Sequence, residues 1–136
     1  MDKVKLLPIK NQKFFNKINS CAIKFSCKDF ILLISPLPQD YHKYTKKKIS
    51  SRKHILYGFK ISRKFGKSVK RNLLKRRVKH ILHKNLANNY IPISLIFIPK
   101  KNCQQANFQE IENSFINAIK WAGKKLKLHH INQNEL

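Results

Sequence analysis

The central part of the chain carries many positive charges and no negative ones. Between Asp40 and Glu110 lie 69 residues that include 19 lysine or arginine residues and no carboxylate. Because these cations have no acidic neighbours in the sequence, the fold has to point them into solvent or toward a polyanion and build its core from other residues. Codon bias can exchange arginine for lysine but does not remove aspartate and glutamate. The pattern therefore favours a polyanion-binding surface over a merely solvated one.

The composition is that of a single, strongly basic globular domain. The chain has 136 residues, a formal net charge of +24 and 42% hydrophobic residues, which is enough to build a core. We expect one domain over residues 1–136, with a core at about 5–127, a basic loop at 39–53 and a C-terminal tail at 128–136. The excess charge makes nucleic acid the leading class of partner, ahead of an anionic membrane surface.

Membrane insertion and secretion are not expected. The apolar runs are far shorter than a membrane span, and the basic N-terminal residues lack the apolar block of a secretory signal. The three cysteines, Cys21, Cys27 and Cys103, are odd in number and have no zinc-like spacing. This cysteine usage favours reduced thiols and a cytoplasmic location.

Hydrophobic periodicity predicts an α+β fold. We expect helices at residues 10–18, at 67–84 and from Asn107 to about 126, and strands at 22–26, 30–35, 54–61 and 93–98. The first two of these strands could instead be one long strand with an interruption. Asn107 and Glu110 have the spacing of a capping box, with asparagine in place of serine or threonine. Gly58, inside the third strand, indicates a bulge or a close backbone approach.

The helix expected at residues 67–84 combines an apolar stripe with a strongly cationic face. Leu74, Val78, Ile81 and Leu82 fall on one side at 100° per residue, which anchors the helix to a core. The other side then holds lysine and arginine side chains at fixed positions, and arginine forks suit phosphate oxygens. RNA is favoured over DNA, because folded RNA is bound largely through its shape and backbone and the chain shows no helix-turn-helix pattern.

The sequence offers few groups for catalysis by the protein itself. Metal-dependent phosphodiester hydrolysis usually needs several carboxylates, and the only close pair, Glu110 and Glu112, is more simply explained as acids at a helix N-terminus. We expect no catalytic residue and no metal ligand in the chain. Two alternatives stay open: a ribonuclease that uses His80 and His83 as acid and base, and a ribosomal or other structural RNA-binding protein without a role in cleavage.

Residues 61–80 resemble the signature of the protein subunit of bacterial ribonuclease P. The family pattern is (V/I)SxKxGxAVxRNRxKRxxRE, and this chain reads ISRKFGKSVKRNLLKRRVKH. The matching residues are Ile61, Ser62, Lys64, Gly66, Val69, Arg71, Asn72, Lys75 and Arg76, and Lys79 conservatively replaces the later arginine. Leu73 stands in place of the pattern's second arginine, and His80 in place of its final acid. The likeness in element order extends over roughly residues 5–127.

The resemblance implies a fold and an activity. The expected fold is a small α+β sandwich of a mixed four-stranded sheet with helices, in which a left-handed βαβ crossover carries the signature helix. The holoenzyme removes the 5′ leader from precursor tRNA, and catalysis belongs to its RNA subunit and the Mg²⁺ ions held there. The expected partners are that catalytic RNA subunit and the precursor tRNA 5′ leader. The protein alone is expected to bind no cofactor, no DNA and no membrane.

The resemblance also implies individual contacts. RNA-subunit contacts are carried onto Arg71, Asn72, Lys75 and Arg76, with Ser62, Lys64 and Lys67 beside them; Lys70, Arg77 and Lys79 join them as further cations of the same helix. In the family, the leader lies in a cleft between the first helix and the sheet. Phe14, Ile18 and Leu33 are the expected leader contacts, although the family often has aromatic residues where this chain has Ile18 and Leu33. Phe15 and Phe30 could be core or cleft residues, and core packing is the favoured interpretation.

Overall fold

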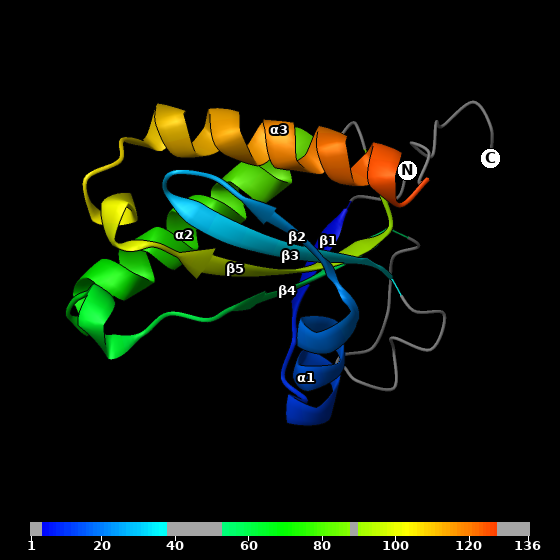
Figure 1. Cartoon of the computed structure of the whole chain (residues 1–136), viewed down its shortest axis with the longest axis horizontal. Helices are drawn as coiled ribbons and strands as arrows, with labels where there is room; N and C mark the ends of the chain where they lie inside the picture. The colour runs from blue at the N-terminus through cyan, green and yellow to red at the C-terminus, as the bar shows by residue number, and fades with distance from the viewer. Residues whose placement is uncertain (1–3, 38–52, 88–89, 128–136) are drawn as a thin grey trace.

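Five strands and three helices follow one another in the described part of the chain, residues 4–37, 53–87 and 90–127 of a computed structural model. The strands are β1 (Lys5–Pro8), β2 (Ile23–Ser26), β3 (Phe30–Pro36), β4 (His54–Phe59) and β5 (Ile93–Pro99). The helices are α1 (Gln12–Cys21), α2 (Ser68–Leu86) and α3 (Phe108–Lys125), and the short 3-10 helices η2 (Arg63–Phe65) and η3 (Lys101–Gln104) precede α2 and α3. The strands form one sheet with α1 on one face and α2 and α3 on the other (Figure 1), which confirms the α+β class.

The sheet has five strands, in the order β1-β4-β5-β3-β2, so the expectation of four strands was wrong by one. The additional strand is β1, which pairs in parallel with β4. The Lys5 amide donates to the Lys53 carbonyl at 2.9 Å, and the Ile9 amide donates to the Tyr57 carbonyl at 2.8 Å. Strand β1 has only four residues and ends in proline, so its sequence carries too little periodicity to predict a strand.

Strands β2 and β3 form an antiparallel hairpin, which decides between the two interpretations of this region. Their register runs from Ile23 opposite Ile34 to Ser26 opposite Ile31. The Cys27 amide donates to the Phe30 carbonyl at 3.0 Å and closes the turn. The segment is therefore two strands and not one interrupted strand.

The middle of the sheet is buried on both faces. Along β3, Phe30, Leu32 and Ile34 point into the core shared with α2 and α3, while Leu33 points into the cluster under α1. A strand that is covered on both faces is apolar throughout, which explains the continuous hydrophobic runs of β3 and β5. Phe30 is fully buried, as expected for a core residue.

Of the two sequence signals for local geometry, the cap at Asn107 is confirmed and the one at Gly58 is not. Asn107 caps α3, because its Oδ1 accepts from the Glu110 amide at 2.8 Å and its Nδ2 donates to Glu110 Oε1 at 3.0 Å. Gly58 is not a bulge, since β4 stays paired with β5 through this residue, and the group that approaches it closely is a side chain and not a backbone. A Cβ atom at Gly58 would lie 3.0 Å from Cε2 of Phe15, so glycine lets the Phe15 ring pack against the strand.

Strand β4, helix α2 and strand β5 form a βαβ unit, because β4 and β5 are parallel neighbours. Strand pairing does not determine the hand of this crossover, so its left-handedness stays an expectation from the resemblance. The expected basic loop at 39–53, apart from the buried Lys53, and the expected tail at 128–136 lie outside the described residues. Among the described helices, none combines the length and the apolar character that crossing a membrane requires.

Candidate nucleic-acid interface

Helix α2 is held against the core by one side. Leu74, Val78, Ile81 and Leu82 are at most 5% exposed, as the apolar stripe predicted, and Leu86 extends the stripe by one turn. A helix buried in this way cannot rotate, so its remaining sides face outward in a fixed direction.

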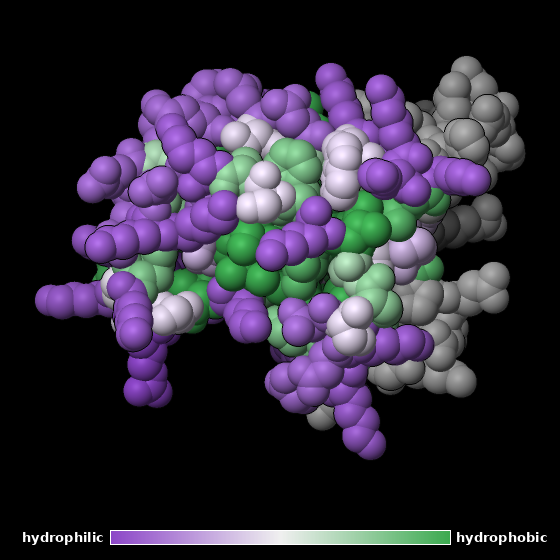
Figure 2. Space-filling view, in the orientation of Figure 1, coloured by the Kyte–Doolittle hydropathy of each residue, from purple (hydrophilic) through white to green (hydrophobic). Residues whose placement is uncertain are grey.

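The outward sides of α2 carry unneutralised positive charge. We define the α2 ridge as Lys67, Lys70, Arg71, Asn72, Lys75, Arg76, Arg77 and Lys79. Of these, Arg71, Lys75 and Lys79 are half-buried on one flank and the others are exposed. Helix α2 contains no carboxylate, and within the described residues its only ion pair joins Lys84 to Glu112. On the face drawn in Figure 2, hydrophilic side chains project from the end of the molecule where η2 and α2 begin.

Arg71 and Lys75 lie half-buried on one flank of the α2 ridge. The Nε atom of Arg71 is buried and has no hydrogen-bond acceptor among the residues that the structure describes. Lys75 Nζ lies 6.0 Å from the centroid of the Phe59 ring, within reach of a cation–π contact. A buried donor without an acceptor is costly.

Residues before α2 shape the start of the ridge. Ser62 caps η2, because its Oγ accepts from the Lys64 amide at 3.1 Å. Gly66 joins η2 to α2 with a φ of +155°, a backbone conformation that favours glycine. These contacts place the exposed side chains of Lys64 and Lys67 beside the first turn of α2. The hydroxyl of Ser62 has a structural role in this turn.

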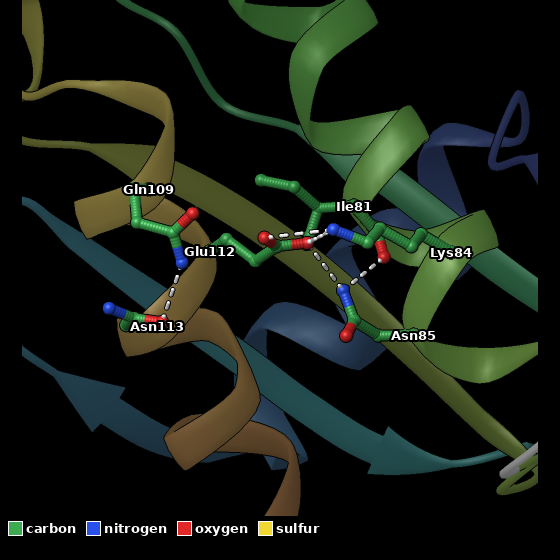
Figure 3. Close-up of polar contacts among 6 residues, drawn as sticks. All are labelled: Ile81, Lys84, Asn85, Gln109, Glu112 and Asn113. Carbon is green, nitrogen blue, oxygen red and sulfur yellow. Dashed lines mark hydrogen bonds and ion pairs between the residues drawn. The ribbon is translucent and has the colours of Figure 1, made fainter.

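A buried carboxylate from α3 joins the second half of α2 to the rest of the fold (Figure 3). Glu112 is 4% exposed; its Oε2 accepts from Asn85 Nδ2 at 3.1 Å and lies 3.3 Å from Lys84 Nζ. Asn85 Nδ2 also donates to the Ile81 carbonyl at 2.9 Å. The hydrogen bond from Asn85 and the Lys84 ammonium hold the pKa of Glu112 below its usual value, although burial opposes this shift. Glu112 is therefore an interhelical contact and not simply an acid at a helix N-terminus.

The expected leader contacts lie together but are not exposed. Phe14 is 1%, Ile18 2% and Leu33 8% exposed, and all three belong to the cluster between α1 and the sheet. This corrects the expectation that they line an open cleft, since buried side chains cannot stack on bases. Phe15 and Ile31 pack against the same cluster and are half-buried, so Phe15 combines core packing with an accessible surface.

Comparison with known proteins shows which family the chain belongs to. A family model described as Ribonuclease P matches residues 5–123. The chain belongs to the ribonuclease P protein family. The family's role is to assist an RNA subunit in processing the 5′ leader of precursor tRNA.

Curated relatives in the ribonuclease P family match most of the chain. The "Ribonuclease P protein component" of Rickettsia canadensis (strain McKiel) is 33% identical over 116 residues, 82% of this chain and 92% of the relative. The protein of the same name from Rickettsia bellii (strain RML369-C) is 35% identical over 114 residues, 82% of this chain and 89% of the relative.

Solved structures of ribonuclease P proteins share the fold. The Staphylococcus aureus RNase P protein has a TM-score of 0.67 at 20% identity, covering 87% of this chain and 96% of that chain. The RNase P protein from Thermotoga maritima has a TM-score of 0.63 at 23% identity, covering 80% of this chain and 91% of that chain.

Within the ribonuclease P family pattern, this chain departs most clearly at Leu73. The Leu73 side chain is 37% exposed on α2, in a position where the pattern has an arginine. The exposed leucine is not needed to anchor the helix, since the buried stripe already does so.

Proposed function

We propose that the chain acts as the protein component of ribonuclease P and binds the RNA subunit through the α2 ridge. The observation that carries this proposal is a cationic surface seated on a buried apolar stripe, with no carboxylate on the helix. Phosphate contacts of this kind position a protein on RNA and supply most of its salt-dependent affinity.

We propose that the protein takes no chemical part in cleavage and that Mg²⁺ is held by the RNA. Of the three described carboxylates, Asp29 and Glu112 are buried, and Glu110 contacts Lys28 and Asn107. Within the described ranges, no three His, Cys, Asp or Glu side chains are placed to hold a metal ion. The three free cysteines fit the cytoplasmic location that belongs to the same proposal.

For the leader, we propose contacts on the α1 side of the sheet by half-buried residues. Phe15 and Ile31 rest on the buried Phe14, Ile18 and Leu33, which hold them in place. Apolar and aromatic surfaces bind single-stranded bases by stacking, and this mode does not require a particular sequence. Such a contact would favour precursor tRNA over mature tRNA, because only the precursor carries the leader.

Reconstitution tests the proposed function. The protein is added to a bacterial ribonuclease P RNA at low Mg²⁺, and precursor tRNA cleavage is compared with that by the RNA alone and by the protein alone. We expect faster cleavage with both components and none with the protein alone, because the cations of the protein reduce repulsion between the two RNAs. No gain over RNA alone would contradict the proposal and favour a structural RNA-binding protein. Cleavage by the protein alone, lost on replacing His80 or His83, would indicate a ribonuclease in its own right.

A further inference from the structure

A pocket of about 200 Å³ opens beside the α2 ridge, where α2 meets η2, η3 and the start of α3. Phe65, Leu74, Cys103 and Ile111 line it and are all buried. Burial raises the pKa of the Cys103 thiol to about 12, with smaller contributions from Asp29 and Cys27, so this thiol is neutral at physiological pH. The floor of the pocket is thus apolar and uncharged.

On the side of the pocket formed by α2, charged and apolar side chains alternate. Lys70, Leu73 and Arg77 line the pocket, and their spacing of three and four residues places them on one strip of the helix. Seven residues of helix separate Lys70 from Arg77 by about 10 Å along the axis. Leu73 and Val69 are the exposed large hydrophobic residues among those the structure describes, and only Leu73 lines the pocket.

We propose that this pocket receives one unstacked base of the RNA subunit, while Lys70 and Arg77 bind phosphates on either side of it. This inference rests on the proposed binding of RNA by the α2 ridge. RNA-binding proteins commonly take bases from loops and bulges and stack them on aromatic side chains or arginine planes, and the lining of this pocket includes Phe65 and Arg77. Drug-sized ligands fill pockets of about 300–1,000 Å³, so this smaller pocket suits a group the size of a single base.

The charges around the pocket favour RNA over a protein side chain as the occupant. An apolar side chain of a protein would fit the apolar floor of the pocket but would leave Lys70 and Arg77 without a negatively charged partner. A nucleotide satisfies both, because it joins an apolar face to a phosphate. The base contact also gives Leu73 a role on RNA where the family pattern has an arginine, with apolar contact in place of a charge.

A matched pair of alanine variants tests the base contact in the complex with the RNA subunit. Leu73→Ala shortens the wall of the pocket, whereas Val69→Ala removes an exposed apolar side chain of the same helix outside it, and neither lowers helix propensity. We expect Leu73→Ala to weaken RNA-subunit binding about 5- to 50-fold, the lower part of the range for removing an aromatic stacking partner of a base, with an unchanged salt slope. Val69→Ala is expected to change RNA-subunit binding less than about twofold.

The salt dependence separates failure of this inference from failure of the proposed function. If Arg76→Ala weakens binding and flattens the salt slope while Leu73→Ala changes nothing, the base pocket is refuted and the α2 ridge stands as the interface. If neither variant changes binding, the α2 ridge is not the interface and the proposed base contact in the pocket is refuted as well.

Cross-linking identifies the base itself. A photoreactive phenylalanine derivative at Gln104, which is exposed at the pocket, is used to find the contacting nucleotide in the bound RNA. We expect an abasic residue at that nucleotide to weaken binding as Leu73→Ala does, and the double change to cost no more than either alone. Additive losses would overturn the proposal, because they would show that Leu73 and the base do not touch.

Discussion

Arg71→Ala and Arg76→Ala are each expected to weaken binding of the ribonuclease P RNA by about 1–3 kcal/mol, the range of charge-assisted hydrogen bonds. Arg76 is exposed on the outward side of α2, and Arg71 holds a buried Nε donor that lacks an acceptor among the described residues. Each lost phosphate contact should also lower the slope of log affinity against log salt by about one. Titration of labelled RNA at several salt concentrations measures both quantities.

The control removes the same type of charge from another helix. Lys120 and Lys124 are exposed on α3, outside the α2 ridge. Their replacement by alanine is expected to change RNA affinity much less than either arginine variant, because only general electrostatic attraction is lost. Equal losses for the α2 and α3 variants would show that the protein binds RNA by net charge and not through the ridge.

Glu112→Ala is expected to destabilise the fold by about 2–3 kcal/mol, as loss of a buried, charged hydrogen-bonding partner does. The change leaves Asn85 Nδ2 without its contact to α3 and removes the partner of Lys84. Chemical denaturation of both proteins measures the difference in the free energy of unfolding. Glu110→Ala is the matched control, and we expect it to cost less than about 1 kcal/mol because the Glu110 side chain is exposed.

The contribution of Glu112 should depend on pH in a defined direction. Its pKa in the folded protein is lowered from the ordinary value of 4.5, so the folded state favours the ionised carboxylate more than the unfolded state does. The stabilisation is therefore complete above the unfolded pKa and is lost as pH falls through the folded pKa. The stability difference between wild type and Glu112→Ala should shrink below about pH 4.5. A difference that grows on acidification would contradict this account.

Helix α3 was the most predictable part of the fold. Asn107 marks its start, and Ile111, Phe115, Ile119 and Ala122 repeat at helical spacing, so the local sequence indicates both where the helix begins and which side is buried. Strand β1 and the hairpin turn at Cys27 were not predictable in the same way. Strand β1 is too short to show periodicity, and the turn lacks the glycine and asparagine that usually mark hairpins.

The cations of the site could be predicted from the sequence, but its tertiary contacts could not. Periodicity groups Phe14, Phe15 and Ile18, but it does not tell that Phe14 is fully buried while Phe15 is half-buried over Gly58. Glu112 and Asn85 lie on different helices, and their hydrogen bond follows from how α2 and α3 pack. The pocket beside Leu73 depends on where η3 brings Cys103.

Lysine acetylation footprinting tests most directly whether the α2 ridge is the RNA interface. The protein is acetylated with and without the ribonuclease P RNA, and the modification of each lysine is measured by mass spectrometry. Lys64, Lys67 and Lys70 beside and on α2, and Lys120, Lys124 and Lys125 on α3, are all exposed in the free chain. We predict that RNA protects the first three and leaves the α3 lysines reactive. Protection of the α3 lysines with unchanged reactivity at α2 would contradict the account.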